Sequence, residues 1–205
     1  MGHRKCPFDP QRGITGLETA IILIAFVVVA SVFAYTILSA GMFSSQKSQQ
    51  AVYSGLDEAQ SSLEIRGGVI LIGDPTGDGT VTQVTFTLSN ALGGAPIDFT
   101  EPLDEDNDGL ADANSKNRVV VSYTDKHNRQ NNLHFQAVPC ANSNDNQLLE
   151  PGEQFQITVT NLADALDTPL STNTQFTLEL KPPTGPVITL QRTTPPLIKR
   201  VMNLL

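Results

Sequence analysis

The sequence predicts an α+β protein, in which a long N-terminal hydrophobic α-helix precedes an all-β antiparallel domain, an immunoglobulin-like sandwich or barrel. Two observations support this fold class. The segment from Ala20 to Phe43 is almost wholly apolar, and beyond Gly68 apolar residues recur at every second position. The 205 residues suffice to bury a substantial core. We divide them into a short N-terminal segment (1–13), a helix (14–67) and a β domain (68–205).

The apolar segment AIILIAFVVVASVFAYTILSAGMF is long enough to cross a membrane. As a helix it would measure about 36 Å at roughly 1.5 Å per residue, against a hydrocarbon core of about 30 Å. Residues 1–13, which precede it, hold Arg4, Lys5 and Arg12 against one acid, Asp9. The excess of basic residues predicts that the N-terminus stays in the cytoplasm and that the C-terminal part crosses the membrane.

The helix is expected to continue beyond the apolar segment. A stripe at helical spacing follows, formed by Val52, Leu56, Ala59 and Leu63. Gly67-Gly68 then provides a stop, so the predicted helix, residues 14–66, would be about 80 Å long. Such a helix cannot be buried within its own chain and needs lipid or other copies of itself. The small residues Ala30 and Ala34, four positions apart, would permit close contact between helices.

A processing signal precedes the helix. Arg12-Gly13 is followed by Ile14-Thr15-Gly16-Leu17-Glu18 and then by the apolar run. This pattern resembles the class III signal peptide of archaellins and type IV pilins, in which a prepilin peptidase cuts after the glycine. The resemblance implies a leader of residues 1–13, a mature N-terminus at Ile14 and a precursor that is transiently in the cytoplasmic membrane. The alternative is cleavage of a secretory signal peptide near Ala34 or Ala40. The apolar run is longer than the apolar region of an ordinary secretory signal peptide.

Glu18 is the fifth residue after the expected cleavage, where type IV pilins also carry a glutamate. A carboxylate at the rim of an apolar segment is costly unless it is paired, and cleavage would create a cationic amine on Ile14 with an ordinary pKa of about 8. The two groups lie four residues apart on one helix face. Glu18 is therefore expected to pair with this amine during assembly. The alternative is that Glu18 has no partner and is stabilised only by the helix dipole, which favours acids in the first turns of a helix.

Seven segments of the C-terminal part are expected to be strands. Three of them alternate strictly between apolar and polar residues and contain the triplets Val84/Phe86/Leu88, Phe155/Ile157/Val159 and Phe176/Leu178/Leu180. The other four are residues 69–72, 119–123, 133–138 and 187–191. Because no helical pattern alternates with them, an antiparallel sandwich or barrel is favoured over a parallel α/β fold.

The resemblance to archaellins extends through this part. The run NQLLEPGEQFQITV that begins at Asn146 and the ending from Ile188 onwards are similar to archaellin sequences in the same order. The resemblance implies an extracellular filament subunit of the archaellum type, which polymerises with itself or with related subunits through its N-terminal helix. Many archaellins lack the acid found at Glu18, so an adhesive type IV pilin stays an alternative. A membrane-anchored or secreted β-sandwich binding module supported by calcium is another.

An acidic segment offers a candidate calcium site. Asp104, Asp106, Asp108 and Asp112, with Gly109, occupy positions 1, 3, 5, 9 and 6 of a calcium-loop pattern, in which alternate oxygens converge on a hard cation. The twelfth position is a serine, so the bidentate glutamate of an EF-hand is missing. A solvated loop with Asx turns is the alternative.

Two weaker candidates and several exclusions complete the sequence analysis. Weaker metal candidates comprise Asp74, Thr76, Asp78 and Gly79, and the run Asn142, Asn144, Asp145 and Asn146 with Glu150. Cys140 is expected to be a small core or strand-end residue, and zinc is not expected at His127 and His134. A net charge of −8 argues against a nucleic-acid partner. No nucleophile elbow, HExxH helix, P-loop or dinucleotide fingerprint is present, so no enzymatic activity is expected.

Overall fold

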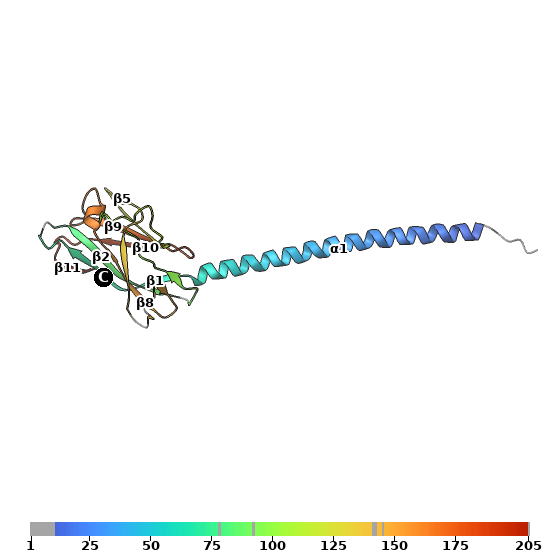
Figure 1. Ribbon diagram of the computed structural model, residues 1–205, viewed down its shortest axis with the longest axis horizontal. Helices are drawn as coiled ribbons and strands as arrows, with labels where there is room; N and C mark the ends of the chain where they lie inside the picture. Colours follow the sequence, from blue (N-terminus) through green and yellow to red (C-terminus); the bar gives the residue numbers. More distant parts are fainter. Residues whose placement is uncertain (1–10, 78, 92, 141–142, 145, 205) are drawn as a thin grey trace, which may run out of the picture. The chain divides into compact units, whose positions relative to one another are not determined.

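The computed structural model describes the chain except residues 1–10, 78, 92, 141–142, 145 and 205, and the side chains of residues 11–15. Figure 1 shows one continuous long helix, α1 (Gln11–Gln60), and a set of strands. The strands are β1 (Leu63–Gly73), β2 (Val81–Asn90), β3 (Ile97–Asp98), β4 (Val120–Asp125), β5 (Arg129–Gln130), β6 (Phe135–Pro139), β7 (Leu148–Leu149), β8 (Gln154–Val159), β9 (Gln175–Lys181), β10 (Ile188–Thr193) and β11 (Val201–Leu204), with a one-turn helix α2 (Leu162–Ala165). The chain divides into two compact units, residues 1–53 and 54–205.

The first unit consists of the apolar helix. Within the described residues, α1 is the helix that is long and apolar enough to cross a membrane. Its large apolar side chains between Leu17 and Tyr53 are all at least 52% exposed. The described chain therefore leaves this apolar surface uncovered, and burying it requires lipid or other molecules.

Two polar residues inside the apolar segment, Ser31 and Thr36, bond to the backbone of their own helix. The hydroxyls of Ser31 and Thr36 donate to the carbonyl oxygens of Val28 and Phe33, three residues earlier, at 2.8 and 2.9 Å. A hydroxyl that is bonded to its own helix backbone costs little in an apolar environment. These residues are therefore compatible with a helix surrounded by lipid or by other helices.

The predicted helix is too long at its C-terminal end. α1 ends at Gln60 rather than at Arg66, and the following segment forms β1. Leu63, which was expected to continue the helical stripe, instead pairs with Asn90 of β2 and is 6% exposed in the sandwich core. Pairing with β2 and burial in the core thus override the helical periodicity over the last turns.

The end of α1 is closed by a serine rather than by the predicted glycines. The backbone N–H and the hydroxyl of Ser61 both donate to the carbonyl oxygen of Asp57, at 3.0 and 2.8 Å. Gly67 lies within β1 with a φ of 80°, at a register shift between Arg66 and Ile70. Its left-handed backbone produces a bulge in the strand, because glycine adopts this conformation without steric cost.

The second unit is a β-sandwich, which confirms the predicted fold class. One sheet has the order β11-β1-β2-β8-β6 and the other β10-β9-β4-β5, and β3 pairs with β7. All paired strands are antiparallel. The sheets form a sandwich rather than a closed barrel. All seven predicted strands are present as β1, β2, β4, β6, β8, β9 and β10.

Aromatic side chains fill the space between the sheets. Phe99 contacts Phe135 and Phe155 edge to face, with ring centroids 6.5 and 5.9 Å apart. Tyr123 of β4 stacks on Phe176 of β9 at 6.2 Å. All five rings are 0% exposed. The second unit therefore has a complete core of its own.

Candidate functional sites: the apolar helix and the acidic loop

The predicted processing and assembly residues all lie on α1. Arg12, Gly13 and Ile14 belong to its first turn, although their side chains fall outside the described part of the structure. Glu18 is exposed, and Ala30 and Ala34 lie one above the other on an exposed helix face, since residues four apart share a face. The structure thus supplies the helix that the assembly hypothesis needs. Cleavage after Gly13 and pairing of Glu18 stay predictions.

The acidic loop between β3 and β4 is organised around Asp104. Its Oδ1 accepts a hydrogen bond from the backbone N–H of Asp108 at 3.1 Å, and its Oδ2 accepts one from Gly109 at 3.2 Å. Asp108 in turn accepts from the N–H of Leu110 at 2.8 Å. These bonds fold the chain back on itself, as the Asx-turn alternative requires.

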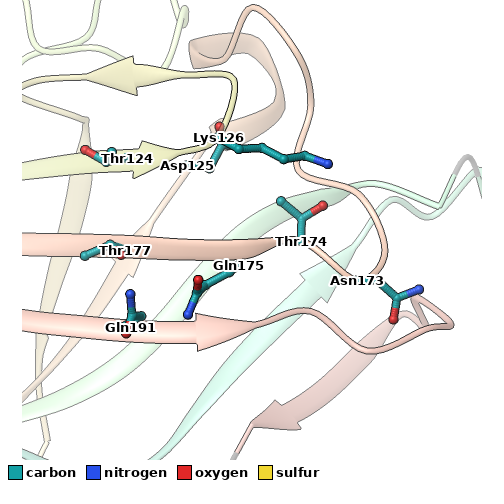
Figure 2. Close-up of a pocket in the computed structure, with 8 residues that line it drawn as sticks. All are labelled: Thr124, Asp125, Lys126, Asn173, Thr174, Gln175, Thr177 and Gln191. Atoms are coloured by element: carbon teal, nitrogen blue, oxygen red, sulfur yellow. The ribbon is translucent and has the colours of Figure 1, made fainter.

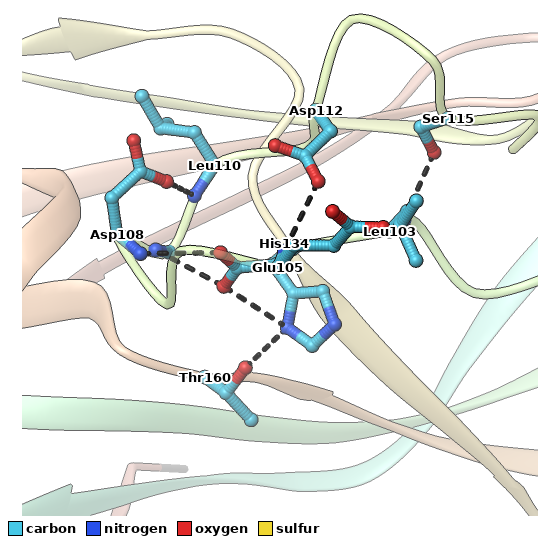
Figure 3. A network of polar contacts seen from close by, with 10 residues as sticks. Leu103, Glu105, Asp108, Leu110, Asp112, Ser115, His134 and Thr160 are labelled. Carbon is cyan, nitrogen blue, oxygen red and sulfur yellow. Dashed lines mark hydrogen bonds and ion pairs between the residues drawn. The ribbon is translucent and has the colours of Figure 1, made fainter.

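A histidine connects this loop to the sandwich, as Figure 3 shows. His134 Nδ1 lies 2.6 Å from Thr160 Oγ1 and 4.0 Å from Asp104 Oδ2. The side chain of Asp104 is 2% exposed and that of His134 is 16% exposed. The backbone N–H of His134 also donates to the carbonyl oxygen of Gly109 at 2.9 Å. Two contacts thus hold the loop to His134, the residue directly before β6, and a third links His134 to Thr160 at the end of β8.

Three of the four predicted calcium ligands come together. Carboxylate oxygens of Asp104, Asp106 and Asp108 all lie within 4.8 Å of one another. Asp112 lies outside this group, and its Oδ2 accepts a hydrogen bond from the backbone N–H of Glu105 at 3.0 Å. Hard oxygen ligands suit calcium, and two of the three carboxylates are exposed. The residues present therefore fit a divalent cation, with Asp112 in a supporting position.

The weaker metal candidates have structural roles where they are described. Asp74 accepts a hydrogen bond from the N–H of Thr76 at 2.7 Å, and this bond lowers the pKa of the Asp74 carboxyl. Asp78 lies outside the described residues, as do Asn142 and Asp145. The side chains of Asn144 and Asn146 each accept a bond from the backbone N–H two residues on, at 3.2 and 2.7 Å. These are Asx turns.

Sequence reasoning missed the role of Glu153, in the run NQLLEPGEQFQITV. This glutamate is 4% exposed. Its Oε1 accepts from the N–H of Asn144 at 3.1 Å, and its Oε2 from the N–H of Glu150 at 3.0 Å. Gly152, with a φ of 88°, makes the turn that precedes it. The sequence did contain a signal for this role, because Glu153 stands directly before the alternating residues of β8. An acid at that position can turn inward and bond the loop that precedes the strand.

Among the described residues, Cys140 and His127 make only local contacts with the backbone or with a neighbouring side chain. Cys140 follows the end of β6 and is exposed, so the prediction of a strand-end residue is confirmed and that of a core residue is wrong. Its sulfur donates to the carbonyl oxygen of Val138 at 3.5 Å. His127 donates its backbone N–H to Asp125 in the turn after β4.

The described residues define a class of protein in which one long apolar helix with an uncovered surface precedes a β-sandwich that has a core of its own. Residues 13–192 match the model of the archaeal-type flagellin family. The chain belongs to this family. It is 35% identical to probable flagellin 1 of Archaeoglobus fulgidus over 210 residues, which cover 95% of this chain and 96% of the relative.

Solved structures agree with this assignment. The chain is similar to the subunit of the archaeal flagellum of Methanospirillum hungatei, at 29% identity and a TM-score of 0.67, over 92% of this chain and 99% of the other. It shares its fold with the archaeal flagellin FlaB1 of Methanocaldococcus jannaschii, at 14% identity and a TM-score of 0.53, over 69% of this chain and 94% of the other. Both similarities support the α+β fold predicted from the sequence.

Proposed function

We propose that this chain is an archaellin, a structural subunit that polymerises through α1 into an archaellum-type motility filament. The observation that carries the proposal is the uncovered apolar helix in a chain whose relatives are flagellins. Packing α1 against copies of itself would remove this surface from water, and the small residues Ala30 and Ala34 would allow the helices to approach closely. The role is structural rather than enzymatic, and the filament is extracellular.

The precursor is proposed to be a substrate of a prepilin peptidase that cuts after Gly13 while α1 is held in the cytoplasmic membrane. Analysis of intact mass and N-terminus on sheared filaments tests this step, and we expect a start at Ile14. Gly13→Phe is expected to leave uncut precursor in the membrane, because a bulky side chain hinders approach of the protease to the backbone. A start at Met1 or after Ala40, or normal filaments from Gly13→Phe, would contradict the cleavage.

Glu18 is proposed to pair with the new amine of Ile14 on its own or a neighbouring subunit. Glu18→Gln should lower filament yield more than precursor insertion, because it removes the charge but little volume. Glu58→Gln, also an exposed acid on α1, is the matched control and should assemble normally. Equal yields from both variants would make Glu18 merely an acid at the start of a helix.

An adhesive type IV pilin is the second candidate function, and Glu18 is the observation that favours it. Deletion of the gene distinguishes the two. Loss of swimming with retained surface attachment supports the archaellin, whereas loss of attachment with retained swimming supports the pilin. The apolar helix and the β-sandwich would serve either filament.

We also propose that the acidic loop binds calcium as a structural ion through Asp104, Asp106 and Asp108. Asp106→Asn is the cleanest test, because the bonds that fold the loop come from Asp104 and Asp108. Glu105→Gln, an adjacent exposed acid outside the group, is the control. Calorimetric titration of the full chain with calcium chloride should show weaker binding for Asp106→Asn only. Absence of a binding heat in the unsubstituted chain would refute the site.

A further inference from the structure

A hollow of about 470 Å³ lies on the outer face of the β10-β9-β4-β5 sheet. Thr124 of β4, Thr177 of β9 and Gln191 of β10 form a row across its floor, since Thr177 pairs with Thr124 on one side and with Gln191 on the other. Figure 2 shows this row, with Gln175 beside Gln191 and with Lys126 reaching along the rim. The volume falls in the range of small-molecule sites, roughly 300–1,000 Å³.

The polar groups of the hollow are available to a ligand. Among the described residues, the side chains of Thr124, Thr177, Gln175, Gln191 and Lys126 make no hydrogen bond or ion pair with the protein. They offer two hydroxyls, two amides and one ammonium group. Hydroxyls and amides both donate and accept, whereas the ammonium group only donates.

The single acid of the lining is already saturated. Asp125 Oδ1 accepts from the N–H groups of His127 and Asn128, both at 2.6 Å. Its Oδ2 accepts from the hydroxyl of Tyr123 at 2.7 Å and from the amide of Asn128 at 3.1 Å. Burial alone would raise the pKa of Asp125, but these bonds outweigh it and hold the pKa below the ordinary value. Asp125 keeps its negative charge, but its oxygens are occupied, so Lys126 is the charged group of the lining that can still bond a ligand, and it bonds acceptors.

The framework of the hollow is rigid. Thr174, at one side of it, is 5% exposed, and its N–H donates to Thr194 Oγ1 at 2.9 Å. The strand pairs β4·β9 and β9·β10 hold the floor in register. The backbone positions of the row are therefore fixed, whereas the unbonded glutamine and lysine side chains can adapt to a ligand and lose rotamer freedom when they bind it.

We propose that this hollow binds a saccharide unit that carries a carboxylate. The hydroxyl and amide row would bond the sugar hydroxyls, and Lys126 would hold the carboxylate. The lining contains no aromatic ring for base stacking and no histidine or cysteine for a transition metal. A ligand rich in hydroxyls with one negative charge matches what remains. This inference is independent of the filament role and of calcium.

Saturation-transfer difference NMR on the full chain in detergent tests the proposal, with galacturonate, galactose and acetate as separate probes. In detergent the chains are dispersed, so neighbouring subunits do not cover the hollow. Galacturonate should receive saturation at about millimolar affinity, galactose should bind more weakly and acetate alone should not bind. Lys126→Gln should weaken galacturonate about two- to fivefold, the range of an exposed ion pair, and leave galactose unchanged.

Two further variants make the result specific. Gln191→Ala should weaken both sugars about two- to tenfold, as expected for loss of hydrogen bonds. Lys181→Gln removes a cation from the same sheet outside the lining and should change neither sugar. The proposal is overturned if neither sugar receives saturation, if acetate binds as well as galacturonate, or if Lys126→Gln and Lys181→Gln behave alike.

Discussion

Replacement of Glu153 by alanine should loosen the loop between β6 and β8 and destabilise the sandwich. Its buried carboxylate accepts two backbone hydrogen bonds, from Asn144 at 3.1 Å and from Glu150 at 3.0 Å. The loop carries β7, whose Leu149 is 0% exposed in the core and pairs with Ile97 of β3. Loss of the carboxylate therefore affects both the loop and a core residue.

The magnitude follows from these two bonds. A hydrogen bond to a charged group contributes about 1.5–3 kcal/mol, so two contribute about 3–6 kcal/mol. Because Asn144 is exposed and its N–H can bond water after the substitution, we expect the lower end, about 3 kcal/mol. In a domain of this size 1 kcal/mol corresponds to roughly 2–4 °C in Tm. Glu153→Ala should thus lower the Tm by about 6–12 °C.

Scanning calorimetry of the full chain in detergent measures this change, and amide hydrogen exchange locates it. Exchange should accelerate first at Leu148 and Leu149. Glu150→Gln is the matched control from the same loop, because the Glu150 carboxylate accepts one bond of 3.3 Å from the exposed Asn144 side chain. We expect it to change stability by less than about 0.5 kcal/mol. An unchanged Tm for Glu153→Ala, or an equal loss in Glu150→Gln, would refute the reasoning.

Three further predictions concern other parts of the molecule. The pKa of Asp125 is lowered in the folded state, so its carboxylate stabilises the fold at pH values above the ordinary pKa of 3.8, and this contribution is lost as the pH falls below that value. Tyr123→Phe removes one of the bonds that lower this pKa and should therefore weaken the decrease of Tm at acid pH. An unchanged decrease of Tm at acid pH would contradict this prediction. Gly109→Ala should destabilise the acidic loop by about 1–3 kcal/mol. Gly109 has a φ of 80°, and a Cβ there would lie 2.5 Å from the carbonyl oxygen of Asn161. Calorimetry measures the loss of stability, and an unchanged Tm would contradict the prediction. Val29→Asp should cost about 2.5–3.5 kcal/mol in membrane insertion and should reduce the membrane-bound precursor in fractionated cells, whereas a normal amount there would contradict a membrane-spanning α1.

Burial on one face made most strands predictable from the sequence. In β8 and β9 every second residue is buried, so the apolar alternation and the sheet geometry agree. The short strands β3, β5 and β7 contain two residues each and have no period to detect. They are defined by pairing between distant parts of the chain, which a local pattern does not record.

The end of α1 shows why periodicity alone was insufficient. Val52, Leu56, Ala59 and Leu63 fit a helical stripe, yet Leu63 belongs to β1. A residue at the junction of two elements can satisfy both patterns, and the partner strand decides between them. Here β2 supplies that partner through the pair Leu63 and Asn90.

The candidate sites were predictable to different extents for a similar reason. The acids of the calcium-loop pattern are close in sequence, so their spacing already brought Asp104, Asp106 and Asp108 together. His134, directly before β6, reaches Asp104 only through the fold, and it is held there by Thr160 at the end of β8. The hollow above β4, β9 and β10 combines three segments whose register no sequence motif encodes.

Charge is distributed unevenly along the chain. No acidic, basic or histidine residue occurs between Glu18 and Lys47. Copies of this segment can therefore pack without like-charge repulsion, and the apolar surface that they bury drives association. Acids outnumber basic residues in the chain by 21 to 13, and all of the acids except Asp9 and Glu18 follow the apolar segment. The sandwich buries a core of its own, and most of the exposed large apolar side chains of the described residues lie on α1, so the helix offers the main apolar surface for association.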